Sequence, residues 1–164
     1  MDSNLIQINS DVYDKCKLEI SGFKIEVESK EYNACSYELN GSNIISRNGK
    51  ITPKKVGQFV TFWKRNGNGP IEPFNEKDKI DYYTVNVRTE KKFGQFVFPK
   101  SILIKKGIIS TANKEGKRAF RVYPTWDIAM SKQAERTQKW QLKYFYEIND
   151  SINFNKVAEL YKAE

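Results

Sequence analysis

Short apolar segments separated by turn residues fill the middle of the chain, and this pattern restricts the fold more than any other feature. Strand-like segments occur at 34–39, 43–47, 57–64, 79–88, 93–98 and 117–123. Asn40-Gly41 is typical of a tight hairpin turn, and Asn48-Gly49 is predicted to form a second turn. Strands at this spacing favour an antiparallel barrel or sandwich over repeated βαβ units.

The segment 57–64 carries apolar side chains on both faces, because Phe59 and Trp63 alternate with Val60 and Phe62. A strand of this kind is expected at the centre of a sheet or in a barrel. The stretch 65–74 that follows is rich in glycine and proline and is predicted to be a loop.

Amphipathic helices are predicted at both ends of the chain. The first covers 4–19 and is expected to end at Ser21-Gly22. A second helix begins at Asp127 or Ser131 and runs to about Tyr146. A short final helix covers 153–162. The first helix has its apolar residues at spacings of three and four: Leu5, Ile8, Val12 and Cys16.

These elements predict one domain over the 164 residues. It comprises an N-terminal helical extension at 1–30, a β-barrel core at 32–126 and C-terminal helices at 127–164. The expected fold class is α+β, with a mostly antiparallel, open β-barrel flanked by helices at both ends.

The chain has no histidine, and this absence excludes whole classes of catalytic site. Ser-His-Asp and Cys-His nucleophile arrangements and His-ligated zinc are ruled out. Cys16 and Cys35 form neither a disulfide framework nor a zinc-ligand pattern. We therefore expect no bound metal and no cofactor.

The positive charge is concentrated in the middle of the chain. Residues 41–146 hold 22 Lys and Arg against 8 Asp and Glu, whereas 1–40 and 147–164 have net charges of −4 and −2. A large asymmetry of one sign favours a polyanionic partner, and a solvated basic surface without a partner is the alternative.

Neither a membrane span nor a secretory signal is expected. The sequence contains no run of about 18 apolar residues, and the N-terminus lacks a basic segment followed by an apolar one. We expect a cytoplasmic protein that does not insert into a membrane, of undetermined oligomeric state.

Four basic segments are candidates for contacts with nucleic acid, DNA in particular. Phosphate contacts are expected from Lys50, Lys54, Lys55 and Lys64. Base-edge contacts are expected from Arg47, Gln58, Arg65 and Asn66. Three further candidates lie in the same loop or at the ends of predicted strands: Thr52, Trp63 and Lys100. The basic surface is extended by Arg118 and Arg121 and by a helical stripe of Lys132, Arg136, Lys139 and Lys143. Core packing of the aromatic side chains and solvated lysines are the alternatives.

Two other functions remain open from the residues. A Mg²⁺-dependent nuclease could use Asp81, Glu90 and Lys92, although Glu90 lies in a predicted turn. An adaptor could bind an acidic protein through the basic surface. The absence of histidine favours binding over catalysis.

Four blocks of the sequence, in order, resemble the MepB family of small bacterial proteins. They are GKITPKKVGQFVTFWKR at 49–65, FGQFVFPK at 93–100, GKRAFRVYPTWD at 116–127 and KQAxxTQKWQ at 132–141. The resemblance covers about 32–146. Members are named for a gene beside a multidrug efflux pump and its regulator.

The resemblance implies a nucleic-acid-binding fold similar to the B3-like pseudobarrel. Together with the charge and the absence of histidine, it leads us to expect a non-catalytic protein that binds double-stranded DNA through a basic face on the barrel. The segment FVFPKSIL at 96–103 is similar to the strand, proline and short helix of that barrel. In that fold two arms grip the major groove of DNA. The corresponding candidates here are the loop 47–55 and the segment 63–66.

Overall fold

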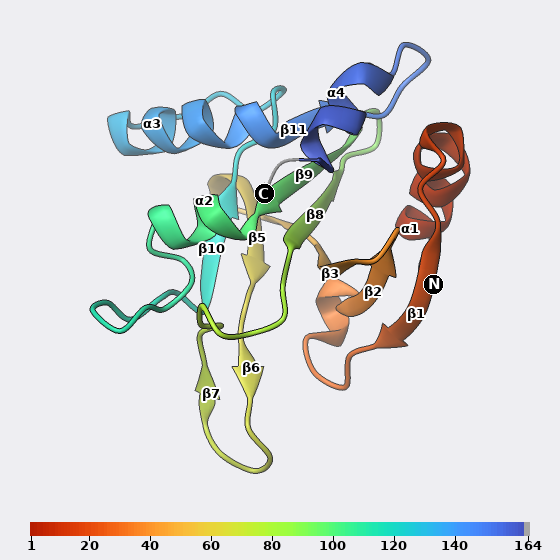
Figure 1. The fold of residues 1–164 in the computed structure, drawn as a ribbon. Helices are drawn as coiled ribbons and strands as arrows, with labels where there is room; N and C mark the ends of the chain where they lie inside the picture. The colour runs from red at the N-terminus through yellow and green to blue at the C-terminus, as the bar shows by residue number, and fades with distance from the viewer. Residues whose placement is uncertain (163–164) are drawn as a thin grey trace.

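A six-stranded sheet forms the middle layer of the protein, in a computed structural model that describes residues 1–162 (Figure 1). The strands lie in the order β1-β2-β3-β8-β9-β11. Their bounds are β1 Ile20–Ile25, β2 Cys35–Leu39, β3 Ser42–Asn48, β8 Tyr82–Arg88, β9 Phe93–Pro99 and β11 Phe145–Glu147. All neighbours pair antiparallel except β3 and β8, which are parallel. The α+β class is therefore confirmed.

A second sheet of three strands packs over one face of the first. Its order is β10-β5-β4, with bounds β10 Ala119–Val122, β5 Lys55–Thr61 and β4 Lys50–Thr52. The expectation that 57–64 holds a central strand is confirmed, because β5 lies between the other two. The stretch predicted as a loop contains a two-stranded ribbon, β6 Lys64–Arg65 with β7 Ile71–Glu72.

The two larger sheets do not close on one another into a barrel. The reason lies at Asn48-Gly49, which is not a hairpin turn. β3 pairs with β8, while β4 pairs with β5. At this point the chain leaves the six-stranded sheet, and the backbone N–H of Gly49 donates to Asn86 O at 2.9 Å. The parallel pair β3–β8 needs a crossover, and residues 49–81 supply it by forming β4, β5 and the β6–β7 ribbon.

Two hydrophobic cores lie on the two faces of the six-stranded sheet. β8 and β9 are buried along nearly their whole length, so side chains from alternate positions enter both cores. One core joins Tyr82 and Val97 to apolar residues of the N-terminal helix and of α4. The other joins Tyr83 and Phe98 to the three-stranded sheet and to α2 (Lys100–Lys105).

The N-terminal helix forms as predicted but ends earlier. It comprises α1 (Ser3–Ile8), a π-helical turn η1 (Asn9–Tyr13) and a 3-10 turn η2 (Asp14–Cys16). Lys17 adopts a left-handed conformation (φ 57°), and its carbonyl accepts from Asn40 Nδ2 at 3.1 Å. Ser21-Gly22 lies inside β1 instead of ending the helix. A contact with the β2–β3 turn thus sets the boundary.

The second helix begins as predicted at Ser131, whose side chain caps α3 (Lys132–Gln141). Its predicted end near Tyr146 is wrong. A 3-10 turn η4 (Leu142–Tyr144) follows α3, and β11 then pairs with β9 at the edge of the sheet. Phe145 and Tyr146 are buried there, so tertiary burial overrides the helical pattern. The last helix, α4 (Phe154–Leu160), is capped by the Asn153 side chain. A 3-10 turn, η3 (Lys30–Tyr32), lies between β1 and β2.

Candidate nucleic-acid interface

The strands of the three-stranded sheet bear positive charge and no carboxylate of their own. Residues 50–61 and 117–123 together contain six Lys and Arg and no Asp or Glu. Asp127, from the segment before α3, reaches the sheet through a hydrogen bond from the backbone N–H of Gly57, and burial raises the pKa of its carboxyl group. The sheet therefore carries many more basic side chains than acidic ones.

A cross-strand ladder on this sheet interleaves cations with an aromatic ring. Phe59 on β5 lies directly opposite Lys50 on β4 and Arg121 on β10, so the three side chains share one face. The Arg121 guanidinium lies 5.8 Å from the Phe59 ring centre, and Lys50 Nζ lies 5.1 Å from that of Tyr32. Aromatic rings thus lie beneath the cations of this face and stabilise their positions.

Arg121 is fixed in place by contacts with the β4–β5 hairpin. Its Nη2 donates to Thr52 Oγ1 at 2.6 Å, and its Nη1 lies 3.4 Å from the carbonyls of Val56 and Gly57. Gly57 has a φ of +83°, and a Cβ there would come within 2.8 Å of the Tyr123 ring. Glycine therefore permits the close approach of β5 and β10 that holds Arg121 beside the hairpin.

A groove of about 400 Å³ continues this face between β10 and α3. Its lining includes Lys106, Lys117 and Arg121 and contains no carboxylate. Lys106 Nζ lies 5.4 Å from the centre of the Trp140 ring, which forms part of the wall. We call Lys50, Lys54, Lys55, Lys117 and Arg121 together the cationic face.

The basic stripe on α3 does not enter the groove. Lys132, Arg136, Lys139 and Lys143 are all exposed. At 100° per residue the stripe is centred about 130° around the helix axis from the side that lines the groove. It adds charge beside the cationic face but belongs to the solvent side of the helix.

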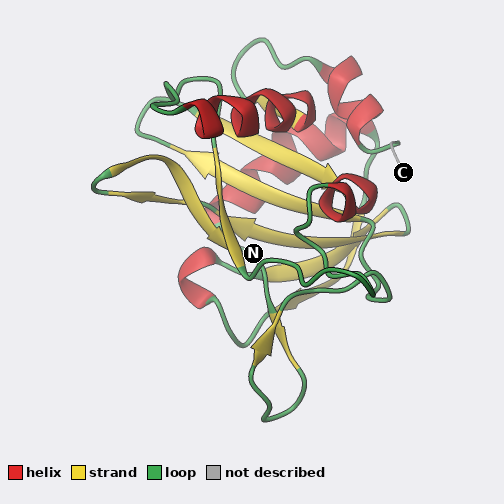
Figure 2. Ribbon diagram, turned by 90° about the vertical axis from the view of Figure 1, so that its left-hand side faces the viewer, coloured by secondary structure: helices red, strands yellow, loops and turns green. Residues whose placement is uncertain are grey.

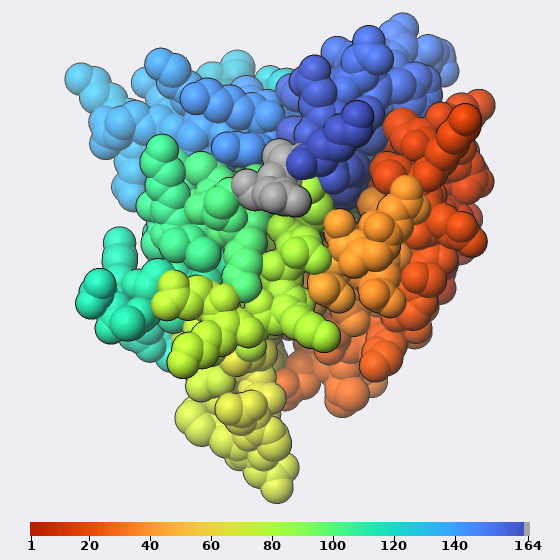
Figure 3. Space-filling model, in the orientation of Figure 1, coloured from red at the N-terminus to blue at the C-terminus, as the bar shows by residue number. Residues whose placement is uncertain are grey.

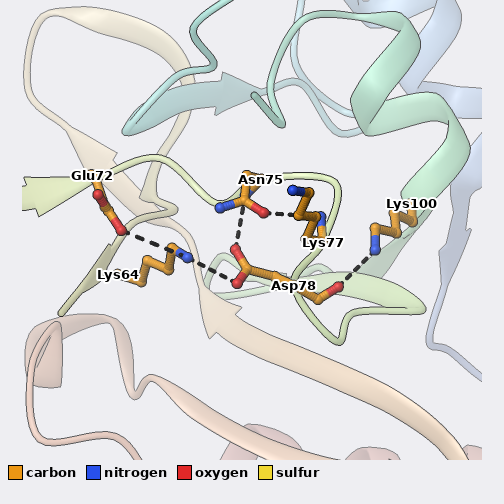
Figure 4. A network of polar contacts seen from close by, with 6 residues as sticks. All are labelled: Lys64, Glu72, Asn75, Lys77, Asp78 and Lys100. Carbon is orange, nitrogen blue, oxygen red and sulfur yellow. Dashed lines mark hydrogen bonds and ion pairs between the residues drawn. The ribbon is translucent and has the colours of Figure 1, made fainter. Parts of the chain in front are cut away.

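Lys64 and Lys100 both form polar contacts with other residues of the protein (Figure 4). Lys64 Nζ lies 2.8 Å from Asp78 Oδ1 and 3.6 Å from Glu72 Oε1. Lys100 Nζ donates to the backbone carbonyl of Asp78 at 2.6 Å. Asp78 in turn accepts from the backbone N–H of Asn75. This network ties the base of the β6–β7 ribbon to α2, which explains both lysines without a ligand.

Arg47 and Gln58, predicted to reach base edges, are buried. Their exposed fractions are 4% and 1%. Arg47 donates to Thr61 Oγ1 at 3.0 Å and to Trp63 O at 3.1 Å, and Gln58 Nε2 lies 3.4 Å from Arg88 O. Strand alternation turns both side chains away from the cationic face, so neither reaches a duplex bound there.

Two further arginines that were predicted to contact DNA each form an ion pair with a glutamate. Arg65 Nε pairs with Glu28 Oε1 at 3.0 Å, and Arg118 Nη2 pairs with Glu115 Oε1 at 3.1 Å. Trp63 is half-buried, and Asn66 is exposed at the end of the β6–β7 ribbon. This ribbon projects from the body of the molecule as a separate hairpin (Figures 2 and 3).

The alternative nuclease site is not assembled. Asp81 precedes β8 and Glu90 follows it, so the strand separates them by about 30 Å at ~3.3 Å per residue. The Asp81 carboxylate accepts from the backbone and side-chain nitrogens of Asn43. Within residues 1–162, no group of three His, Cys, Asp or Glu residues is placed to hold a metal ion. Asp81, Glu90 and Lys92 therefore do not form one site.

The sequence interpretation missed Lys106, Lys117 and the aromatic side chains of the face. Lys117 lies within the block 116–127, so its positive charge can be recognised from the sequence. The roles of Phe59 and Tyr32 depend on which strands become neighbours, and no local pattern specifies that pairing.

Comparisons with known proteins agree with this architecture. The sequence profile of the MepB-like family matches residues 26–147. The crystal structure of MepB is 34% identical, covers 92% of this chain and all of its own, and has a TM-score of 0.79. A bacterial homing endonuclease is 13% identical over 86% of this chain and 93% of its own, and its TM-score of 0.43 is too low to support an argument. No curated protein matches the sequence. No helix within residues 1–162 is long and apolar enough to cross a membrane.

Proposed function

The chain belongs to the MepB-like family, and we propose that it binds double-stranded DNA, without chemistry on it, through the cationic face. The single observation that supports this proposal is a cluster of cations in and beside the three-stranded sheet, in segments 50–61 and 117–123 that contain no carboxylate: Lys50, Lys54, Lys55, Lys117 and Arg121. Lysine and arginine side chains without acidic partners are the groups that neutralise phosphates.

The arrangement of the cationic face suits an extended polyanion. The β4–β5 hairpin places Lys54 and Lys55 at its tip, and both are exposed. Arg121 and Lys117 continue the positive charge into the groove beside α3. A groove lined by one sign of charge attracts a chain of phosphates more than a single small anion. The exposed stripe on α3 adds positive charge beside this face and is not counted among its phosphate contacts.

The salt dependence of duplex binding tests the proposal. Fluorescence anisotropy of a labelled 20-base-pair duplex would give the dissociation constant at several salt concentrations. Five phosphate contacts predict a slope of log K against log salt of about −4.5, at ~0.9 per contact. No measurable binding at about 50 mM salt would refute the proposal.

A triple variant locates the interface. Replacing Lys50, Lys54 and Lys55 by alanine leaves two of the five contacts and should reduce the slope to about −1.8. The matched control replaces Lys15, Lys24 and Lys79, which are exposed and lie outside the cationic face. The control should keep the slope of the unmodified protein. Equal slopes for the two triple variants would contradict the assignment of this face.

Catalysis is tested separately. Supercoiled plasmid incubated with the protein and Mg²⁺ or Mn²⁺ should remain intact, because Asp81 and Glu90 lie at opposite ends of β8. Nicking that survives the Glu90→Ala substitution would point to a different catalytic site, and nicking lost in that variant would restore the nuclease alternative.

A further inference from the structure

An open cleft of about 630 Å³ lies apart from the cationic face, between the base of the β6–β7 ribbon and the segment 26–28. Its floor is β3, where Ile45 and Arg47 are two residues apart and therefore point to the same side. Trp63 and Phe74 contribute aromatic surface, and Glu26 and Glu28 contribute carboxylates. Unlike the cationic face, this cleft contains groups of both signs.

Arg47 is a buried cation in this cleft that has no carboxylate within ion-pair distance among residues 1–162. Two of its nitrogens donate to neutral oxygens, those of Thr61 and Trp63, and its buried Nε has no hydrogen-bond partner in the described part of the chain. Burial lowers the pKa of this guanidinium. A buried charge with an unsatisfied donor is costly unless an acceptor arrives, and the adjoining cleft is where one can enter.

The other side chains that line the cleft restrict which kind of acceptor can bind beside Arg47. The Glu26 side chain lies close enough to Arg47 to stabilise its charge, yet its carboxylate forms no ion pair within residues 1–162. Glu28 is occupied by Arg65, whose guanidinium lies 5.7 Å from the Trp63 ring centre. Two carboxylates at the cleft disfavour a bare phosphate. A neutral, flat ligand with acceptors on one edge and donors on another satisfies both Arg47 and Glu26.

We propose that this cleft binds a guanine base. Its O6 and N7 atoms would accept from Arg47, its N1–H and N2–H groups would donate to Glu26, and its ring would stack on Trp63. Arginine is the side chain that matches the O6/N7 edge of guanine, and aromatic rings stack on any base. Adenine fits less well, because it presents an amino donor where guanine presents O6.

A guanine can come from a free nucleotide or from an unpaired position in nucleic acid, and only the second source rests on the proposed DNA binding. Isothermal titration with GMP and AMP tests the first source. Anisotropy with duplexes that carry one bulged G or one bulged A tests the second. Preference for guanine in either pair supports the proposal, with adenine expected to bind about tenfold more weakly. Equal affinities, or no binding, in both pairs would overturn it.

Substitutions separate this site from the cationic face. Glu26→Gln should weaken guanine binding about tenfold, while Glu38→Gln, an exposed carboxylate on β2, serves as the matched control. Glu26→Gln should leave binding to a fully paired duplex unchanged. The triple substitution of Lys50, Lys54 and Lys55 should weaken duplex binding and spare GMP. If paired duplex fails to bind and GMP binds, only the proposed function fails. If Glu26→Gln binds guanine as tightly as the unmodified protein, the assignment of this cleft fails.

Discussion

Gln141 joins α3 to the edge of the three-stranded sheet, and replacing it should lower the stability of the protein. Its side chain has no exposed surface. Its Oε1 accepts from the backbone N–H of Tyr123 at 2.9 Å, and its Nε2 donates to Arg121 O at 2.8 Å. The amide thus takes the place of a neighbouring strand for β10. An unpaired strand edge would otherwise lie against the helix.

Gln141→Met keeps the length of the side chain and removes both hydrogen bonds. Each buried backbone group left unpaired costs about 1–3 kcal/mol. Arg121 and Tyr123 are only half-buried, so water can reach part of this backbone. We therefore expect the free energy of unfolding to fall by about 2–4 kcal/mol, near the lower end for two such groups.

Urea denaturation followed by tryptophan fluorescence measures this change, and the exchange rate of the Tyr123 amide hydrogen locates it. Gln133→Met is the matched control, because Gln133 is exposed on the same helix, and it should stay within about 0.5 kcal/mol. Duplex affinity should also fall in the Gln141 variant, since β10 carries Arg121. A loss of stability below about 0.5 kcal/mol would refute the view that this amide holds β10.

Two further predictions test the packing of the six-stranded sheet. Gly94→Ala should destabilise the protein by about 1–3 kcal/mol, because the new Cβ would meet the Phe145 ring at 2.5 Å; an unchanged melting temperature would contradict the packing of β11 on β9. Burial raises the pKa of Cys35 to about 12, so at pH 8 its thiol should react with iodoacetamide about a thousandfold more slowly in the native protein than in urea. The unfolded state loses this proton at lower pH, so stability falls as pH rises above 9. Equal labelling rates would show that Cys35 is accessible.

The strands that the sequence predicted well are those whose limits are set by local chemistry. Residues 34–39 and 43–47 correspond to β2 and β3, joined at Asn40-Gly41. Both turn residues have positive φ, 48° and 88°, which asparagine and glycine tolerate best. The Ser131 cap of α3 was predictable for the same reason, because a cap depends on the next three residues only.

Elements that depend on distant partners were mispredicted. Phe145 and Tyr146 fit the apolar side of a helix equally well, and only the free edge of β9 makes them a strand. The strand that follows Asn48-Gly49 does not pair with β3, because β3 pairs in parallel with β8 and β4 pairs with β5. Each outcome is a choice between pairings of similar local quality, which burial against the rest of the chain decides.

The candidate site also has features that local sequence predicts and features that distant contacts decide. The sequence located the basic segments, but it could not tell which cations are free. Lys54 and Lys55 are exposed at a hairpin tip, whereas Lys64 pairs with Asp78 and Arg47 is buried. These differences arise from contacts across 14 or more residues, so they lie outside any local pattern.

By itself, the sequence determined the α+β class, the family and the concentration of positive charge, because composition, periodicity and turn chemistry are local properties. The tertiary structure alone decided that β3 pairs with β8 and that Lys50 and Arg121 flank Phe59. It also decided that a buried arginine lies beneath a cleft with carboxylates. The physical reason is that strand pairing and burial are properties of the whole chain, because each strand's partner is chosen by the surface that the complete fold removes from water.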